Sequence, residues 1–282
     1  MQRSIKFVSV IIPCYNDGKL IHEAIESVLN QTCQNFEILI IDDGSKDNET
    51  IQVLRNLDTP KTKVYRKENG GPASARNFGI GKSKGQFILT LDADDKFAPD
   101  FLKKGLEILD SKPQVGMVTS YITRIYKNSE IKAKLSGGDV SAFVIKNEAS
   151  ASLLYRYKCW EDAGGYDEDI PGFEDWEFAL NVTKQGWTVH SIPEYLFFYS
   201  GIENSQYSKD LLSRPEIIKY LINKHEDIFI DNMKEILLDR ELQLHELKEK
   251  VSKFENSYSQ LIGNAIIKPV KAIRDFFYLT ER

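Results

Sequence analysis

Short apolar runs alternate with segments of helical spacing over the first half of the chain. The runs at residues 7–12, 36–41 and 86–91 have the composition of buried strands, and Val64-Tyr65 indicates a shorter strand between the last two. The segments between the runs place apolar residues three or four positions apart, as amphipathic helices do. Strands separated by about a dozen helical residues are typical of βαβ units. The pattern therefore predicts an α/β fold, with a mostly parallel sheet and helices on both faces.

Beyond the first half the pattern changes twice. Residues 115–126 have the pattern of one strand, and a mixture of strand-like and helical segments continues to about residue 199. Beyond Ser213 the chain becomes helical and highly charged. We therefore expect a folded domain over residues 1–212, followed by a helical extension over residues 213–282.

The extension carries two different helical patterns. Apolar residues recur with heptad spacing over residues 230–261, interrupted at Arg240, which is typical of a coiled coil. Gly263-Asn264 is expected to end this helix. Residues 266–279 then place an apolar face beside basic side chains, which suits shallow binding to anionic lipid. We expect the heptad segment to form a homo-oligomer, with folding back onto the domain as the alternative, and the last segment to contact a membrane surface.

Composition and charge narrow the class of protein. Of the 282 residues, 41% are hydrophobic and 28% are charged, which is ordinary for a globular chain. The net charge of −5 offers no basic field, and we therefore exclude nucleic acid as a partner. Three cysteines without paired spacing argue against a disulfide framework and favour the cytoplasm. No apolar run approaches the ~18 residues that span a bilayer, so any membrane contact is expected to be peripheral, on the inner face of the cell membrane.

Polar side chains follow three of the predicted strands at the point where each strand ends. Asn16 follows the first strand, Asp42-Asp43 the second, and Asp92-Ala93-Asp94-Asp95 the fourth. The carboxyl ends of parallel strands lie at one edge of a sheet, and ligands of such sheets bind beyond that edge. The sequence therefore predicts a ligand-binding rim that contains all three polar segments.

The acidic segment after the fourth strand is the strongest candidate for a metal site. Asp92 and Asp94 are two positions apart, so in extended geometry both side chains would point the same way, with Asp95 beside them. Ligands that are all oxygen suit Mg²⁺ or Mn²⁺, and such a cation commonly shares its shell with a diphosphate. The alternative is an acidic loop that caps the following helix.

Three further segments each have a functional and a purely structural interpretation. Asp42-Asp43-Gly44-Ser45 could accept hydrogen bonds from a base or ribose, or be a turn. The Gly-rich segment 69–77 could present a helix N-terminus to an anion, or be a plain loop and cap. In Glu174-Asp175 a carboxylate could act as a general base, or the acids could simply favour the first turn of a helix.

Taken in chain order, these segments resemble the motifs of family 2 of inverting glycosyltransferases, of the type found in bacterial cell-envelope polysaccharide synthesis. The resemblance covers residues 6 to 205. The matching segments are residues 8–16, 42–45, 69–77 and 92–95, and Gly164-Gly165-Tyr166-Asp167 followed by Glu174-Asp175. The resemblance implies the GT-A fold, a Rossmann-like mixed sheet that is mostly parallel, with a helical extension after it.

The resemblance also implies a role for each matching residue. Pro13 and Tyr15 would border the nucleobase, and Asp43 would hydrogen-bond uracil. Asp175 would be the catalytic base, with Glu174 beside it. The nucleotide-sugar site would comprise Pro13, Tyr15, Asn16, Asp43, Gly71, Arg76, Asp92, Ala93 and Asp94, and the Mn²⁺ or Mg²⁺ ligands would be Asp94, Asp92 and Asp95.

The reaction implied is a single displacement, with inversion, from a UDP-sugar to the hydroxyl of a carbohydrate or lipid-linked acceptor. The chain departs from many members of the family at Tyr199-Ser200-Gly201-Ile202, where they carry Tyr-Arg-x-His. It also lacks the Gln-x-x-Arg-Trp motif of processive synthases, so we expect transfer of one sugar per binding event. Two other functions remain open: a catalytically degenerate scaffold and a sugar nucleotidyltransferase. The latter should have a Gly-rich loop after the first strand, where this chain has Pro13-Cys14-Tyr15-Asn16.

Overall fold

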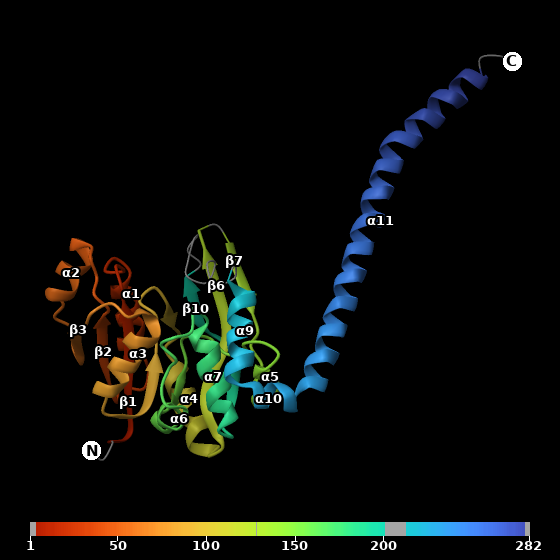
Figure 1. Ribbon diagram of the computed structural model, residues 1–282. Coiled ribbons are helices and arrows are strands. Elements are labelled where there is room, and N and C mark those ends of the chain that lie inside the picture. Colours follow the sequence, from red (N-terminus) through yellow and green to blue (C-terminus); the bar gives the residue numbers. More distant parts are fainter. Residues whose placement is uncertain (1–3, 128, 201–212, 280–282) are drawn as a thin grey trace. The chain divides into compact units, whose positions relative to one another are not determined.

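A mixed sheet forms the centre of the protein in the computed structural model, which describes residues 4–127, 129–200 and 213–279 (Figure 1). Within these residues its strands follow the order β3-β2-β1-β4-β9-β6-β10-β5, with β7 paired to β6 and β8 to β10. The strands are β1 (Ser4–Cys14), β2 (Phe36–Asp42), β3 (Thr62–Arg66), β4 (Gly85–Thr90), β5 (Lys96–Phe97), β6 (Val115–Tyr126), β7 (Ser129–Ala133), β8 (Gly137–Gly138), β9 (Leu154–Arg156) and β10 (Thr188–Ser200).

The long strands run mostly parallel. β1 pairs in parallel with β2 and β4, β2 with β3, and β6 with β10, whereas β9 is antiparallel to both β4 and β6. The predicted α/β fold with a mostly parallel sheet is therefore confirmed. The helices are α1 (Ile21–Leu29), α2 (Asn48–Arg55), α3 (Gly71–Lys82), α4 (Phe101–Ser111), α5 (Val140–Phe143), α6 (Tyr157–Ala163), α7 (Glu174–Lys184), α9 (Arg214–Lys224), α10 (Glu226–Asp231) and α11 (Met233–Leu279).

Alternate residues of the central strands supply two hydrophobic layers. Val8, Val10 and Ile12 of β1 belong to the core shared with α1 and α4. On the other face α3 lies close to the sheet, because Gly79 has no side chain: a Cβ there would lie 2.7 Å from Cγ2 of Ile11. The absence of a side chain at Gly79 therefore allows α3 to pack directly against the sheet.

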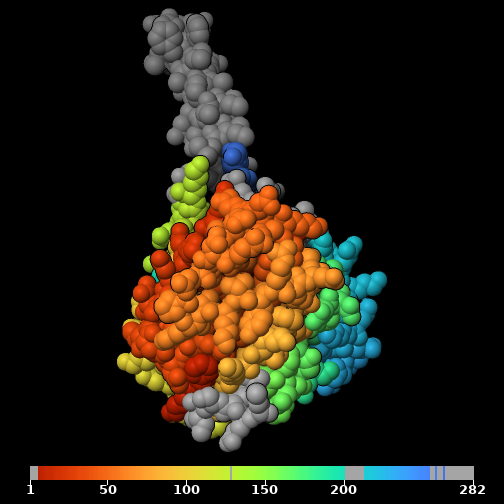
Figure 2. Space-filling view, turned by 90° about the vertical axis from the view of Figure 1, so that its left-hand side faces the viewer, coloured from red at the N-terminus to blue at the C-terminus, as the bar shows by residue number. Residues whose placement is uncertain are grey.

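The carboxyl ends of β1, β2 and β4 meet at one edge of the sheet. Cys14, the last residue of β1, is in register with Asp42, the last residue of β2. Seen from the β3 side, the surface of this part of the protein comes largely from the N-terminal third of the chain, coloured red to orange in Figure 2. One continuous stretch of chain therefore supplies three of the predicted motifs to this edge.

The helices after residue 213 divide between two compact units. The first unit spans Met1–Asn232 and includes α9 and α10, and Ile217 and Leu221 of α9 are fully buried. The second unit begins at Met233 and consists of α11. The expected boundary between residues 212 and 213 marked the end of the catalytic domain. A division into compact units does not define a catalytic domain, so that boundary stays a prediction.

One expectation about the helical extension is wrong, and another falls on side chains outside the described part of the chain. α11 continues through Gly263-Asn264, where we expected a helix end; one glycine costs a helix only about 1 kcal/mol relative to alanine, which the neighbouring turns can offset. The side chains of residues 266–279, on which the predicted apolar face depends, lie outside the described part of the chain. Within the described residues, no helix has both the length and the apolar character to cross a membrane.

Candidate functional site

The buried guanidinium of Arg76 joins two of the predicted motifs. The side chain is 2% exposed; Nη2 donates to Asp92 Oδ1 at 2.7 Å, and Nη1 donates to Glu174 Oε1. Burial tends to lower the pKa of Arg76, but the charges of Asp92 and Glu174 raise it overall, so the group stays ionised. Arg76 therefore ties the acidic turn after β4 to the first turn of α7, which lie far apart in the sequence.

The acidic segment after β4 is a turn rather than an extended continuation of the strand. The backbone N–H of Asp95 donates to the carbonyl oxygen of Asp92 at 3.1 Å, so the side-by-side arrangement expected for Asp92 and Asp94 does not follow from strand geometry. Asp95 is 1% exposed and accepts the N–H of Ser200 at 2.9 Å. Burial, followed by the charges of Asp94 and Asp92, raises the pKa of Asp95 well above its usual range. Asp95 therefore fixes the end of β10 to the turn, and Ala93 is buried beside it.

A further acid, which the sequence analysis did not single out, belongs to the same cluster. Burial raises the pKa of Asp17, and the charge of Asp92 raises it further. Asp94 has its pKa raised to about 7 by burial, then by Asp92 and Asp17. The signal available in the sequence was the position of Asp17 directly after Asn16, at the end of the first strand.

This cluster suits a hard divalent cation by its chemistry. It presents carboxylate oxygens with mutual repulsion that a cation would relieve, and Mg²⁺ and Mn²⁺ prefer oxygen ligands. However, the described residues contain no group of three or more His, Cys, Asp or Glu side chains arranged to hold a metal ion. A cation bound by Asp94 and Asp92 would therefore need ligands from the substrate as well.

Asp43 organises the loop before α3. Its carboxylate is 4% exposed and accepts Lys67 Nζ at 2.8 Å. The backbone N–H groups of Gly70 and Gly71 also donate to it, the latter at 2.8 Å. Gly71 adopts a φ of 84°, a conformation that glycine reaches without strain. The predicted role of Asp43 at a nucleobase stays a prediction, and the structure shows that the carboxylate already holds the loop.

Asn16, at the end of β1, likewise makes a structural contact at a position that was predicted to bind the nucleotide sugar. Its Oδ1 accepts the N–H of Lys46 at 2.8 Å, which joins the loop after β1 to the loop after β2. Its φ of 62° lies in the left-handed region, where asparagine is one of the few side chains found regularly. Beside it Tyr15 is 40% exposed and Pro13 is partly exposed, so both can be reached from the rim.

On the other side of Arg76, α3 also holds the loop that precedes α7. Asn77 Oδ1 accepts Trp160 Nε1 at 2.9 Å and the N–H of Tyr166 at 2.8 Å. Gly164 and Gly165 have φ angles of 76° and 94°, which accounts for the paired glycines of this motif. The role of Asn77 was not visible in the sequence, because it depends on contacts with residues about ninety positions away.

Asp175, the predicted base, is partly exposed at the start of α7. Asn147 Nδ2 donates to its Oδ2 at 2.8 Å. Burial, followed by the charge of Glu174, raises the pKa of Asp175 to about 7, against the lowering effect of Arg76. A carboxyl group that titrates near neutrality can accept a proton from a substrate hydroxyl.

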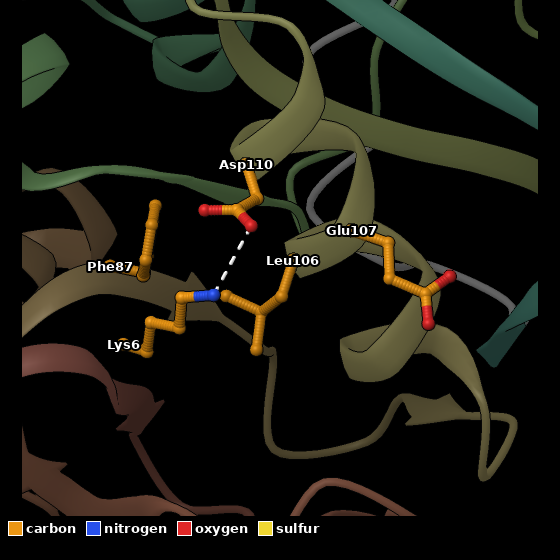
Figure 3. A pocket seen from close by; sticks show the side chains of 5 residues that line it. All are labelled: Lys6, Phe87, Leu106, Glu107 and Asp110. Carbon is orange, nitrogen blue, oxygen red and sulfur yellow. Dashed lines mark hydrogen bonds and ion pairs between the residues drawn. The ribbon is translucent and has the colours of Figure 1, made fainter.

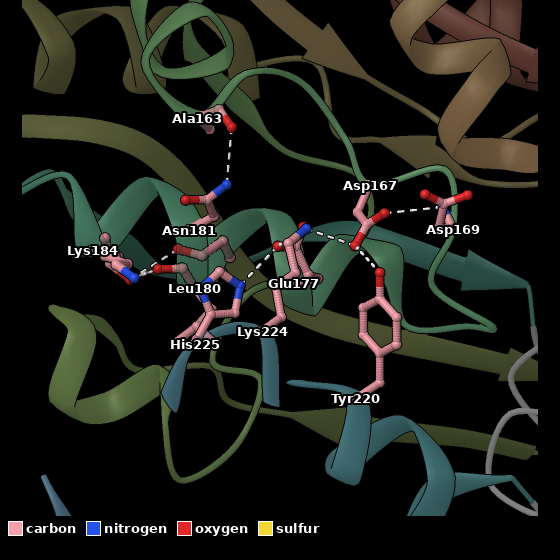
Figure 4. A network of polar contacts seen from close by, with 12 residues as sticks. Ala163, Asp167, Asp169, Glu177, Leu180, Asn181, Lys184, Tyr220, Lys224 and His225 are labelled. Atoms are coloured by element: carbon pink, nitrogen blue, oxygen red, sulfur yellow. Dashed lines mark hydrogen bonds and ion pairs between the residues drawn. The ribbon is translucent and has the colours of Figure 1, made fainter. Parts of the chain in front are cut away.

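A second polar network, shown in Figure 4, anchors α9 to α7 and to the glycine loop. Glu177 of α7 is fully buried and contacts His225 Nε2 and Lys224 Nζ, both at 2.8 Å. Lys224 also pairs with Asp167 at 2.6 Å, and the Tyr220 hydroxyl donates to Asp167 at 2.8 Å. Although burial raises the pKa of Asp167, these partners lower it overall. Asp167, from the predicted glycine motif, is therefore a structural anchor.

A shallow pocket at the opposite edge of the sheet lies apart from these groups. It is lined by Phe87 and Leu106 and by Lys6, which pairs with Asp110 at 3.1 Å (Figure 3). Lys6 and Phe87 lie near the amino ends of β1 and β4, whereas the acidic turn follows the carboxyl end of β4. Gly201 and Ile202 of the predicted departure from the family lie outside the described residues.

Comparison with known sequences agrees with the arrangement of these motifs. The sequence profile of the family described as "Glycosyl transferase family 2" matches residues 9–161. A chondroitin synthase of Pasteurella multocida is 30% identical over 194 residues, which is 66% of this chain and 20% of that protein. A putative teichuronic acid biosynthesis glycosyltransferase, TuaG, of Bacillus subtilis is 28% identical over 202 residues, covering 70% of this chain and 80% of that protein. This chain spans about a fifth of the length of several of the curated relatives that it matches.

Solved structures share the fold. TarS of S. aureus in complex with UDP-GlcNAc has a TM-score of 0.63 and 21% identity, covering 81% of this chain and 72% of that chain. The mannosyltransferase PcManGT of Pyrobaculum calidifontis, in complex with GDP-Man and Mn²⁺, has a TM-score of 0.61 and 17% identity, covering 81% and 68%. At these identities the likeness concerns the fold alone, and it is that of GT-A glycosyltransferases.

Replacing Arg76 should destabilise the protein strongly. Arg76→Met leaves Asp92 and Glu174 without their shared buried partner, and breaking such a pair costs about 3–5 kcal/mol. We expect urea unfolding to show a loss of this order, whereas Arg55→Met, at an exposed position of α2, should change stability by less than about 0.5 kcal/mol. Equal stability of the two variants would show that Arg76 does not connect the motifs energetically.

Proposed function

The chain belongs to glycosyl transferase family 2, and from this we propose that it is an inverting transferase that moves one sugar per binding event from a UDP-sugar to an acceptor hydroxyl. The observation that supports this proposal most is the bridge formed by Arg76, which brings the acidic turn and Asp175 to the same rim. The names of the relatives favour a role in the synthesis of a polysaccharide or glycoconjugate, with a carbohydrate or a lipid-linked acceptor.

On the donor side, the exposed rim residues and the acidic turn have separate tasks. Tyr15 and Pro13 border the base, and the loop held by Asp43 shapes the floor beneath it. Asp94 and Asp92 hold a divalent cation, Mn²⁺ or Mg²⁺, while Asp95 keeps the turn in place. When bound, such a cation stabilises negative charge on a departing diphosphate.

On the acceptor side, Asp175 acts as the general base. The acceptor oxygen forms its bond to the anomeric carbon as the bond from that carbon to the diphosphate oxygen breaks, and the hydroxyl proton passes to Asp175. A single displacement of this kind inverts the anomeric configuration and needs no covalent intermediate on the protein. The carboxylate of the neighbouring Glu174 is bound by Arg76 and serves the bridge.

The proposal for α11 is association with a second copy of the chain. Residues of the heptad remain exposed on this helix: Leu237 by 63%, Leu247 by 58% and Leu244 by 49%. A long helix with an unpaired apolar seam is stabilised by a partner helix. Pairing would place two copies of segment 266–279 together, which would strengthen the weak membrane contact expected of one.

Asp175→Asn should abolish the proton transfer while leaving donor binding nearly intact. We expect UDP release in the presence of acceptor to fall by about 10²-fold or more, the usual scale for loss of a general base. Because only the ionised carboxylate accepts a proton, wild-type turnover should rise with pH up to about 7 and then level off. The exposed Asp231→Asn serves as the matched control. Loss of donor affinity in Asp175→Asn would instead make Asp175 a donor ligand.

Asp94→Asn should abolish cation-dependent binding of UDP without unfolding the protein, because it removes one carboxylate of the cluster. Calorimetric titration with UDP, with and without Mn²⁺, measures this directly. Asp58→Asn, at an exposed position, should bind like the wild type. Mn²⁺-dependent affinity that is unchanged in Asp94→Asn would refute the metal assignment.

A charge in the seam of α11 should separate the copies. Leu244→Lys places an ammonium between apolar residues, whereas His245→Lys places the same group beside the seam. Light scattering should show a dimer or higher oligomer for the wild type and for His245→Lys, and a smaller species for Leu244→Lys. Flotation with anionic liposomes should weaken in parallel. A monomeric wild type would favour a helix that folds back.

A further inference from the structure

Asn147, in the loop between α5 and β9, contacts the predicted base in a defined orientation. Its Nδ2 donates to Asp175 Oδ2 at 2.8 Å, and its Oδ1 accepts the backbone N–H of Ala149 at 3.1 Å. A backbone N–H can only donate, so the amide atom that faces it must be the oxygen. The amino group of Asn147 must then face Asp175. The amide orientation is therefore set by the loop itself, independently of the contact with Asp175.

The loop that carries Asn147 is itself anchored. The neighbouring Glu148 is 6% exposed, and its Oε2 accepts the N–H of Ser136 at 2.9 Å while its carbonyl oxygen accepts the N–H of Gly137 at 3.2 Å. On the other side, Trp176 Nε1 donates to the Phe143 carbonyl at 2.7 Å, which ties α7 to α5. Both partners of the contact between Asn147 and Asp175 are consequently held by separate bonds.

The groups around Asp175 act in opposite directions on its ionisation. Burial and the neighbouring charge of Glu174 favour the protonated form, and the phenol of Tyr166 also lies within its electrostatic reach. Arg76, the backbone N–H of Trp176 and the amino group of Asn147 favour the ionised form. Of these, Asn147 can be altered without disturbing the buried bridge of Arg76.

We infer that Asn147 is a positioning residue of the transfer reaction, which holds Oδ2 of Asp175 and thereby directs the second carboxylate oxygen toward the acceptor hydroxyl. The inference rests on the proposed function, in which Asp175 is the base. An amino group donates and cannot accept, so it bonds well to the carboxylate that must take the proton. The pair would thus keep the base both oriented and ionised near neutral pH.

The test measures the ionisation of Asp175 directly in the full chain, by NMR with ¹³C-labelled aspartate carboxyl groups. The Asp175 signal is the one missing from Asp175→Asn. In Asn147→Ala the midpoint should move upward from about 7 by about one pH unit, the size expected for one hydrogen bond to a charged group. In Asn147→Asp, which keeps the shape but adds a like charge, the shift should be larger. Asn181→Ala removes a comparable amide bond on α7, to the Ala163 carbonyl, and should leave the midpoint unchanged.

Measurements of turnover then test whether the contact between Asn147 and Asp175 affects the reaction. For Asn147→Ala we expect the acidic limb of the pH profile of kcat to move with the NMR midpoint, a lower kcat at every pH, and an unchanged KM for the donor. An unshifted midpoint in a folded Asn147→Ala variant would overturn the inference alone. Turnover of Asp175→Asn at the wild-type rate would overturn the proposed base, and with it the positioning role. The NMR midpoint distinguishes these two failures, because it is measured without turnover.

Discussion

The buried charge of Arg76 holds together the two parts of the predicted site, the acidic turn after β4 and the start of α7. The guanidinium of Arg76 is almost fully shielded from water, a position that is costly unless the charge is paired and hydrogen-bonded. Asp92 and Glu174 supply that pairing from opposite sides, one from the turn after β4 and one from the start of α7. The position of each motif consequently depends on the other. The close approach of α3 to the sheet at Gly79 brings the guanidinium to this position.

The environment on each side of this bridge sets the ionisation of the remaining acids. Asp94 lies with like charges, and burial and repulsion raise its pKa to about 7. Asp175 reaches about the same pKa by burial beside Glu174, but it has a donor in Asn147. Under the proposed function, the first environment suits a bound cation and the second suits transfer of a proton. The same type of side chain is thus suited to two different tasks.

The predicted base lies beyond the segment that matches the family profile. That match ends at residue 161, before Asp175 and before the network of Glu177 and Asp167 with α9. The buried contacts of Glu177 make α9 part of the first compact unit. Asp175 itself therefore lies outside the shared segment, whereas Asn147 and Arg76, which bond to Asp175 and Glu174, lie within it.

The sequence alone was sufficient to predict the α/β fold, the main strands and the rim, because buried strands and the polar residues at their ends are local patterns. It also identified Asp94 and Asp175 as candidates through their motifs. It did not show that Asp92 to Asp95 form a turn, that Arg76 is a buried bridge, or that Asn147 reaches Asp175. The bridge of Arg76 and the contact of Asn147 join residues far apart in the chain, such as Arg76 and Glu174, and no periodicity or spacing reports them. Only the tertiary structure brings such groups together, since their ionisation and orientation depend on burial and on neighbours that the fold supplies.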